Sequence, residues 1–202
     1  MSDQSEFDDE RIAALERIYR TPSMRNRRRQ VRDALGLESG EDVLSVGTGP
    51  GFESQGLAAD VGEDGRVHGI DSAAPMLTVA RERCTDQGWA TFEEGDAANL
   101  PVANETFDAA TAVQVYEYVA DLDTAFSELY RALRPGGRAV VLTSDARSMT
   151  FHASDQARSD RITDAFGDHY VNPQLALTAK ARLERANFTV TDQEPYVHFE
   201  TD

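Results

Sequence analysis

A glycine-rich segment near residue 50 constrains the fold of this chain more than any other feature. Residues 42–46 form a short apolar and β-branched run, which is typical of a buried strand. Gly47, Gly49 and Gly51 follow, and a helix-length segment begins at Phe52. Glycines allow a sharp turn and the close approach of a ligand, and a helix N-terminus offers that ligand free N–H groups. The pattern predicts the first strand, turn and helix of a nucleotide-binding βαβ unit.

An acidic residue after the next predicted strand makes this pattern more specific. We expect that strand over residues 66–70, and Asp71 follows it, 20 residues after Gly51. A carboxylate there can accept hydrogen bonds from both hydroxyls of a ribose, and its charge repels a 2′-phosphate. The alternative, that Asp71 only caps the following helix, is compatible with the same residues.

Strands and helices continue to alternate as far as residue 143. Further strands are expected over residues 90–94, 107–113 and 138–143, and helices over residues 52–60, 73–87 and 122–133. The segment Arg134-Pro135-Gly136-Gly137 should end the last of these helices sharply. This alternation predicts an α/β fold: a doubly wound, Rossmann-like, mostly parallel sheet with its site at the carboxyl ends of the strands.

Further elements are expected on both sides of the repeat. Helices are predicted over residues 5–19 and 23–35 before it, and over residues 155–166 and 173–186 after it. Residues 188–194, or as far as 199, read as a sixth strand, which leaves only residues 196–200 for a seventh. We therefore expect the seventh strand to be missing or rudimentary, and a homodimer would cover the resulting sheet edge. We interpret residues 1–40 as helices that cover the site and residues 41–202 as the ligand-binding part of a single domain.

The chain is strongly acidic, with 20 Lys and Arg residues against 36 Asp and Glu residues and a net charge of −16. This charge repels phosphates, so nucleic-acid binding is not expected. An acidic surface is best tolerated where salt screens its self-repulsion. We hypothesise a salt-adapted protein, and the alternative is a merely acidic one.

Several function classes are disfavoured. No apolar run approaches the ~20 residues of a membrane span, and the acidic residues 1–10 do not resemble a secretory signal. The single cysteine, Cys84, excludes a disulfide framework within the chain and a multi-thiolate metal site, and we expect no metal. These features fit a cytoplasmic enzyme.

The segment 43–143 resembles the class I S-adenosylmethionine-dependent methyltransferases, in the group that includes the ubiquinone/menaquinone-biosynthesis methyltransferases. The matching motifs cover about half of the chain and occur in the family's order. They are Val43-Leu44-Ser45-Val46-Gly47-Thr48-Gly49-Pro50-Gly51, Gly69-Ile70-Asp71 with Met76-Leu77, Gly95-Asp96-Ala97, Leu100-Pro101 with Phe107-Asp108, and Leu133-Arg134-Pro135-Gly136-Gly137.

This resemblance implies a cofactor, S-adenosyl-L-methionine, and the residues that hold it. Asp71 would bind the ribose hydroxyls, Asp96 would accept from the adenine amino group, and the N-terminal helices would close over the cofactor. The implied cofactor-binding residues are Tyr19, Arg28, Gly47, Thr48, Gly49, Gly51, Asp71, Ser72, Met76, Asp96, Ala97, Gln114 and Val115.

One position departs from the family's pattern. Relatives usually have Asp or Glu where Ser45 stands, and that carboxylate helps to fix the glycine loop and the ligand's amino group. The leading hypothesis is a methyltransferase that acts on a small-molecule acceptor. The alternative is a non-catalytic S-adenosylmethionine-binding or interaction protein with a degenerate methyltransferase fold. An NAD-binding oxidoreductase is a third reading, which Asp96 and the turn at residues 135–137 disfavour.

The acceptor side carries weaker signals. Asp145 and His152 follow the strand predicted over residues 138–143, so both are candidates for acceptor contact or for a general base. The alternative is a polar loop with a helix cap. Methyl transfer from a sulfonium needs mainly alignment, and a base only for a poor nucleophile. Gln114-Val115-Tyr116-Glu117 lacks the prolines of nucleic-acid amino methyltransferases, and one cysteine is too few for an arsenite methyltransferase.

Overall fold

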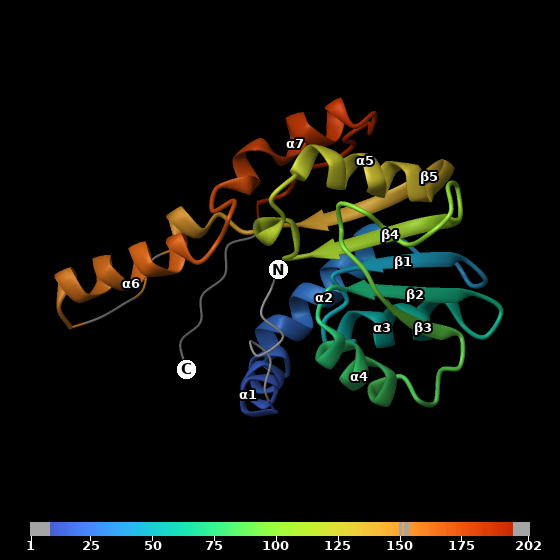
Figure 1. Cartoon of the computed structure of the whole chain (residues 1–202), viewed down its shortest axis with the longest axis horizontal. Coiled ribbons are helices and arrows are strands. Elements are labelled where there is room, and N and C mark those ends of the chain that lie inside the picture. Colours follow the sequence, from blue (N-terminus) through green and yellow to red (C-terminus); the bar gives the residue numbers. More distant parts are fainter. Residues whose placement is uncertain (1–8, 150, 152–153, 196–202) are drawn as a thin grey trace.

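The computed structural model describes residues 9–149, 151 and 154–195, and its centre is a parallel sheet in the order β3-β2-β1-β4-β5. The chain runs from β1 outward to β3 and then returns to place β4 on the other side of β1 (Figure 1). The strands are β1 (Asp42–Val46), β2 (Arg66–Asp71), β3 (Ala90–Glu94), β4 (Phe107–Val113) and β5 (Leu133–Leu142). The predicted α/β, doubly wound fold is confirmed, and its topological switch point lies between β1 and β4.

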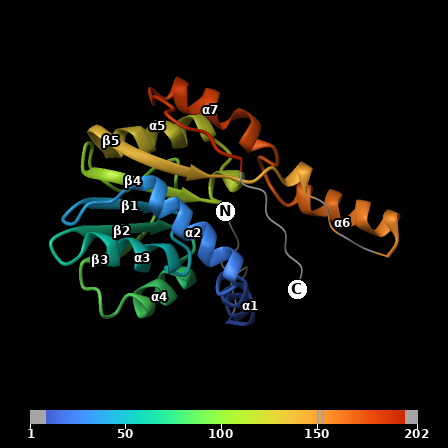
Figure 2. The same cartoon turned by 180° about the vertical axis from the view of Figure 1, so that it is seen from behind.

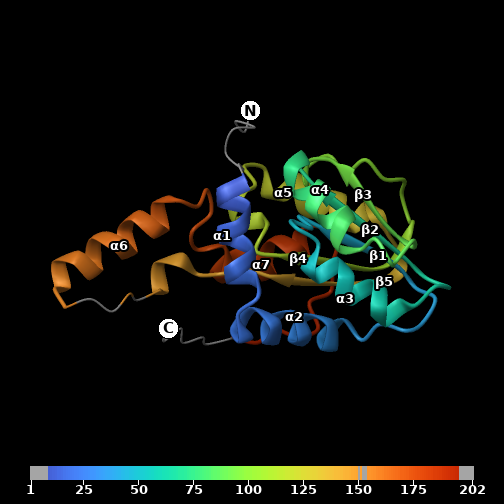
Figure 3. The ribbon, with the colours of Figure 1, turned by 90° about the horizontal axis from the view of Figure 1, so that it is seen from below.

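Helices cover both faces of this sheet. They are α1 (Asp9–Tyr19), α2 (Pro22–Leu35), α3 (Phe52–Val61), α4 (Ala74–Arg83), α5 (Leu122–Ala132), α6 (Gln156–Asp168) and α7 (Leu175–Arg185), with short 3₁₀ turns at Tyr116–Tyr118 and Ala146–Ser148. Helices α2 and α3 lie across one face (Figure 2), while α5 and α7 pack together over the other, beside β4 and β5 (Figure 1). Helix α6 projects away from this body in all three views (Figures 1–3).

The alternation of side chains along β1 explains the two layers. Val43 is fully buried in the cluster with α2 and α3, whereas Leu44 and Val46 belong to the larger cluster with α5 and α7. Successive residues of a strand point to opposite faces, so one apolar strand supplies both cores. Ser45 shares the face of Val43 and is 2% exposed, which places it under α2 and α3.

Helix α2 has well-defined ends, and this fixes the residues that it presents to the sheet. The Thr21 hydroxyl accepts a hydrogen bond from the Met24 amide (3.4 Å), and Pro22 occupies the first turn, where its missing N–H costs nothing. Gly36 ends the helix with φ +58°. Val31 and Leu35 are buried on its inner face.

Two element bounds differ from the prediction by more than two residues, the end of α4 and the start of β5, and the predicted start of the first helix is not tested. Helix α1 is described only from Asp9, and residues 5–8 lie outside the described residues. Helix α4 ends at Arg83, not at residue 87. Strand β5 begins at Leu133, which pairs with Phe107, but the next pair is Ala109 with Arg138. The four residues 134–137 therefore loop out of the strand as a bulge, where a simple turn was expected.

The predicted sixth strand is wrong for residues 188–195, which form no strand. Asn187 has φ +71° after α7, and the Phe188 amide donates to the Leu183 carbonyl (3.0 Å). The Phe188 ring then packs on Tyr130 of α5, with 5.2 Å between ring centroids. The chain is turned onto the helix layer instead of along β5, so its alternating residues find no ladder partner. The segment 196–200, considered for a seventh strand, lies outside the described residues.

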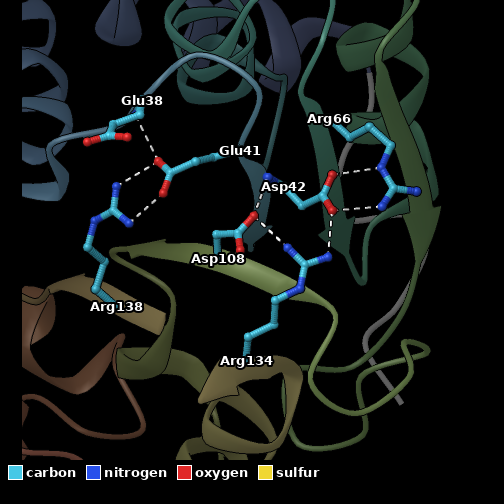
Figure 4. Close-up of polar contacts among 7 residues, drawn as sticks. All are labelled: Glu38, Glu41, Asp42, Arg66, Asp108, Arg134 and Arg138. Atoms are coloured by element: carbon cyan, nitrogen blue, oxygen red, sulfur yellow. Dashed lines mark hydrogen bonds and ion pairs between the residues drawn. The ribbon is translucent and has the colours of Figure 1, made fainter. Parts of the chain in front are cut away.

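The amino ends of the strands are joined by an ionic network (Figure 4). Asp42 of β1 accepts two hydrogen bonds from Arg66 of β2 (2.7 and 2.8 Å) and one from Arg134 (2.8 Å). Arg134 also pairs with Asp108 of β4 at 2.6 Å. Bidentate arginine–carboxylate pairs are among the stronger ion pairs in proteins. The network therefore ties β1, β2, β4 and the bulge of β5 together at the end of the sheet opposite the glycine turn.

A second ion pair, separate from this network, lies at the same end of the sheet. Arg138 of β5 donates to both oxygens of Glu41 (2.8 and 2.7 Å) and to the carbonyls of Leu35 and Gly36 (2.6 and 2.7 Å). The Glu38 amide donates to the same Glu41 carboxylate (2.8 Å). Hydrogen bonds from Arg138 lower the pKa of Glu41, and hydrogen bonds from Arg66 lower the pKa of Asp42.

In the described part of the chain, no helix combines the length and the apolar character needed to cross a membrane.

The ionic network predicts a specific acid sensitivity. Asp42→Asn removes a carboxylate that accepts charged hydrogen bonds, so the free energy of unfolding at pH 7 should fall by about 1–3 kcal/mol. A carboxyl whose folded pKa is depressed stabilises the fold above its unfolded pKa and loses that contribution as pH falls through the folded value. The difference from the parent protein should therefore shrink below about pH 4.

Urea unfolding of both proteins between pH 3 and pH 8 measures this difference. Asp64→Asn, at an exposed acid in the turn before β2, is the control and should stay within ~0.5 kcal/mol of the parent. An equal loss at pH 3 and pH 7 would show that the charge of Asp42 is not the cause.

Candidate active site

The glycine turn after β1 is held in a conformation that requires glycine. Gly47, Gly49 and Gly51 have φ values of +63°, +53° and +80°, in the left-handed region. A Cβ on Gly47 would lie 2.2 Å from Cγ2 of Val115, the predicted neighbour after β4. A Cβ on Gly49 would meet nothing within 4 Å, so the main chain there faces open space. A bare backbone with room above it is what a bound ligand needs.

Asp71 at the carboxyl end of β2 ties this turn to the neighbouring strand. Its Oδ2 accepts a hydrogen bond from the Gly49 amide (2.7 Å), and its Oδ1 accepts from the Ala73 amide (2.9 Å). Burial raises the pKa of Asp71, and the backbone hydrogen bonds partly oppose that rise. Helix α4 begins after Ala73, so Asp71 is not its N-cap residue. Each carboxylate oxygen keeps a lone pair for a further donor.

A pocket opens beside the turn, between α2 and the carboxyl ends of β1 and β4. Of the predicted cofactor residues it brings together Tyr19, Arg28, Gly47, Thr48, Gly49 and Gln114. The remaining lining residues are Met24, Arg27, Pro50, Phe52, Glu53 and Val113. Residues of α1 and α2 and residues of the glycine turn therefore line the same pocket.

Phe52, the first residue of α3, anchors those helices. The guanidinium carbon of Arg83 lies 3.5 Å from the centre of its ring, Arg28 lies 5.0 Å from it, and the Tyr19 ring is 5.8 Å away. Arg83 also donates to the Pro50 carbonyl (2.7 Å) and forms an ion pair with Glu16 of α1. Cation–π contacts of this kind join α1, α2 and α4 at the mouth of the pocket.

Two carboxylates at the site are buried, and both lack a full set of partners. Glu53, in the first turn of α3, is 7% exposed, and neither of its oxygens accepts a hydrogen bond from the described part of the chain. Burial raises its pKa to about 7, against the opposing fields of Arg32 and Arg28. Glu117, after β4, is 1% exposed; its Oε1 accepts from the Ser144 amide (2.7 Å), and burial raises its pKa.

Gln114 links the cofactor side of the pocket to the loop after β5. Its backbone has φ +56°, which is uncommon for a residue with a side chain. Its Oε1 accepts from Arg27 of α2 (2.8 Å), and its Nε2 donates to the Ser144 hydroxyl (3.0 Å). A bridging amide of this kind fixes α2 relative to the strand ends that line the pocket.

The other predicted cofactor residues do not line this pocket. Asp96 follows β3, is exposed, and accepts a hydrogen bond from the Ala98 amide (2.8 Å). Its neighbour Ala97 is half-buried, Ser72 is exposed, and Met76 is 4% exposed within α4. Gly51 packs against Ala80 of α4, where a Cβ would lie 2.8 Å from the Ala80 Cα. Their assignments stay predictions, placed along the ends of β2 and β3.

The two predicted catalytic residues have different outcomes. Asp145 is half-buried and caps the short turn Ala146–Ser148, with its Oδ1 accepting from the Arg147 amide (3.1 Å). This cap agrees with the alternative interpretation of Asp145 as part of a polar loop with a helix cap. The predicted contact of Asp145 with the acceptor stays a prediction. His152 lies outside the described residues.

Sequence reasoning missed Arg27, Phe52, Glu53 and Glu117 as site residues. A signal was available for Glu117, a charged residue among apolar and aromatic ones directly after a predicted buried strand. Glu53 gave a similar signal, as the acidic residue of the first helical turn after the glycines. An acidic residue in a first helical turn also suits the helix dipole without any ligand, so this signal alone does not identify a site.

The residues present fit a nucleoside linked to an amino acid, the outline of S-adenosylmethionine. The bare turn at Gly49 leaves room for the ligand, and Asp71 offers acceptor positions for ribose hydroxyls. The pocket is lined by Arg27, Arg28 and the unpartnered carboxylate of Glu53. Within residues 9–149, 151 and 154–195, no group of three or more His, Cys, Asp or Glu side chains is arranged to hold a metal ion.

The contact between Gly47 and Val115 predicts a large effect of one methyl group. Gly47→Ala places a side chain at φ +63° and against Val115, so the free energy of unfolding should fall by about 2–4 kcal/mol. Adding Val115→Ala removes the overlap and should recover part of the loss. The measurement is urea unfolding, with Gly88→Ala as the control, since a Cβ at Gly88 meets nothing within 4 Å. Equal stability of the Gly47 and Gly88 variants would contradict the described packing.

Comparison with known proteins identifies the family. Residues 44–141 match the family model described as a methyltransferase domain. An arsenite methyltransferase from Halobacterium salinarum is 32% identical over 161 residues, which cover 79% of this chain and 40% of that protein. A ubiquinone/menaquinone biosynthesis C-methyltransferase from Cellvibrio japonicus is 39% identical over 113 residues, 54% of this chain and 45% of that protein.

A solved structure agrees in fold. Phosphoethanolamine N-methyltransferase 2 of Haemonchus contortus, in complex with S-adenosyl-L-methionine, superposes with a TM-score of 0.74 at 22% identity, covering 93% of this chain and 43% of that one. The chain spans about half the length of the curated relatives it matches. The motif order, the parallel sheet and these matches show that the chain belongs to the class I S-adenosylmethionine-dependent methyltransferases.

Proposed function

We propose that this chain transfers a methyl group from S-adenosylmethionine to a small-molecule acceptor. The observation that carries the proposal is the joined pair of Gly49 and Asp71 next to a pocket that α2 closes. The family supports the cofactor, and the relatives named above act on small molecules according to their names. The alternative of a non-catalytic binding protein has no support from these relatives.

In this proposal the predicted cofactor residues keep their roles. Asp71 holds the ribose hydroxyls, Asp96 and Ala97 border the adenine, and Gly47, Thr48 and Gly49 contact the cofactor through the main chain. Tyr19 and Arg28 close the methionyl end, which is the part of the pocket where they lie with Gln114. Residues 1–40 act as the cover of the site and the remainder as the cofactor-binding part.

The chemistry asked of the protein is alignment. The cofactor, when bound, supplies a methyl group on a positively charged sulfur that is already activated for attack. The chain binds it, orients it through the glycine turn, and excludes water with α2 and Phe52. For an acceptor that must lose a proton, Asp145 and His152 are the predicted bases, and the buried carboxylate of Glu117 is a third.

The acceptor is proposed to be an organic small molecule and not arsenite. Soft metalloid ions are held by thiolates, whereas these 202 residues contain one cysteine, Cys84, which is buried. A nucleic acid is disfavoured by the net charge of −16. We further propose a cytoplasmic location, adaptation to high salt, and a homodimer that covers the edge of β5.

The cofactor assignment predicts a selective effect of Asp71. Calorimetric titration should show micromolar binding of S-adenosylmethionine and S-adenosylhomocysteine, and no binding of NAD. Asp71→Ala should weaken both adenosyl compounds by about 10- to 100-fold, since it removes charged hydrogen bonds to the ligand and to Gly49. Asp64→Ala, at an exposed acid, is the control. Failure of the parent protein to bind either compound at low salt and at molar KCl would favour the interaction-protein alternative.

The charge predicts the response to salt. Raising KCl from 0.1 to 2 M shortens the screening length and relieves self-repulsion among the excess carboxylates. We therefore expect the melting temperature to rise over this range, although the exposed ion pairs weaken. Differential scanning calorimetry at constant pH measures it. A melting temperature that falls steadily with KCl would contradict salt adaptation.

A further inference from the structure

The buried carboxylate of Glu53 has no partner that explains it. Its side chain lines the pocket from the first turn of α3, it is 7% exposed, and neither oxygen accepts a hydrogen bond from the described residues. Burying an ionisable group without hydrogen bonds is costly, so such groups are rare outside functional sites. A partner supplied by a ligand would remove that cost.

The arginines near Glu53 are engaged elsewhere. Arg32 forms an ion pair with Asp60 at 2.9 Å, and Arg28 donates to the Tyr19 carbonyl at 2.8 Å while it lies over the Phe52 ring. Arg27 donates to Gln114 at 2.8 Å. Arg28 and Arg32 influence Glu53 through their fields without hydrogen-bonding it. The free position beside its carboxylate is therefore suited to a small cation that carries N–H donors.

We propose that Glu53 binds the α-ammonium group of the methionyl end of S-adenosylmethionine. The inference rests on the proposed function and adds a residue to it. An ammonium brings three donors to the two unpartnered oxygens. The carboxylate of the same methionyl end is repelled by Glu53 and is directed towards Arg28, whose guanidinium keeps N–H donors beyond the one that it gives to the Tyr19 carbonyl. The pocket thereby binds the amino-acid end of the cofactor in one orientation, with the ammonium at Glu53 and the carboxylate at Arg28.

The experiment compares two adenosyl ligands that differ only at that end. S-adenosylhomocysteine carries the ammonium and carboxylate, whereas 5′-methylthioadenosine lacks both. In calorimetric titrations at pH 8, Glu53→Gln should raise the Kd of S-adenosylhomocysteine at least tenfold. The Kd of methylthioadenosine should stay within twofold of its value for the parent protein. Glu82→Gln, at an exposed acid on α4, removes one charge elsewhere and should change neither. Equal weakening of both ligands, or of neither, overturns the proposal.

The pH dependence of binding is a second readout. The groups that face Glu53 are Arg28 and Arg32 from α2 and Asp60 from α3, and with its pKa near 7 the carboxyl is mostly protonated at pH 6. Ammonium binding needs the ionised form. The affinity for S-adenosylhomocysteine should therefore rise about tenfold from pH 6 to pH 8 in the parent protein and stay flat in Glu53→Gln. A rise that persists in the variant overturns the proposal.

Thermal stability separates this role from a structural one. The pKa of the buried, unpartnered Glu53 carboxyl is higher in the folded protein than in the unfolded chain. Such a group destabilises the unliganded protein at pH values above its unfolded pKa. Glu53→Gln should therefore raise the melting temperature of the unliganded protein at pH 8. A lower melting temperature would show that Glu53 is the structural counter-ion of Arg28 and Arg32, against the proposal. If the parent protein binds neither adenosyl ligand, the proposed function itself fails, and this inference fails with it.

Discussion

The hydrogen bond from the Gly49 amide to the Asp71 carboxylate holds the rest of the site in place. The turn after β1 has three residues in left-handed conformations and cannot rely on a regular ladder of its own. A carboxylate from the next strand supplies an acceptor at the centre of the turn and positions the start of α3. Phe52 and Glu53 follow Gly49 by three and four residues, so the anchor of the N-terminal helices and the pocket's buried acid both depend on that contact.

Acidic residues have opposite surroundings at the two ends of the sheet. At the amino ends, Asp42 and Glu41 are paired with arginines, and hydrogen bonds lower their pKa values. At the carboxyl ends, Glu53 and Glu117 are buried, and desolvation raises their pKa values. The first arrangement stabilises the folded chain, whereas the second costs stability that only a ligand or a proton can return. The contrast agrees with the placement of the proposed site at the carboxyl ends of the strands.

The central sheet was predictable because its signals are local. Strands β1 and β4 are short apolar runs, and the glycine turn and Asp71 have the spacing that is typical of a nucleotide-binding βαβ unit. The contacts of α1 and α2 with the pocket were implied by family resemblance and not by the residues themselves. Nothing in the N-terminal sequence indicates that Tyr19 and Arg28 meet Gly49.

What was missed depends on partners distant in sequence. Residues 188–195 alternate as a strand does, but Phe188 is captured by Tyr130, which lies 58 positions earlier. The pairing of Asp42 with Arg134 spans 92 positions, and no pattern of period 2 or 3.6 encodes it. The burial of Glu53 was hidden for a similar reason, since it is the packing of α2 that removes this carboxylate from water. Periodicity describes a face of one element, and these features belong to pairs of elements.

The ionic network of Figure 4 and the glycine turn lie at opposite ends of the sheet, so each can be changed without disturbing the other. The network lies at the start of β1, and the glycine turn lies at the end of the same five-residue strand, roughly 15 Å further along the sheet. Substitutions that far apart, with no shared partner, act additively on the free energy of unfolding. Substitutions in the arginine–carboxylate network can therefore change the stability of the fold while the glycine turn and the pocket at the other end are left intact.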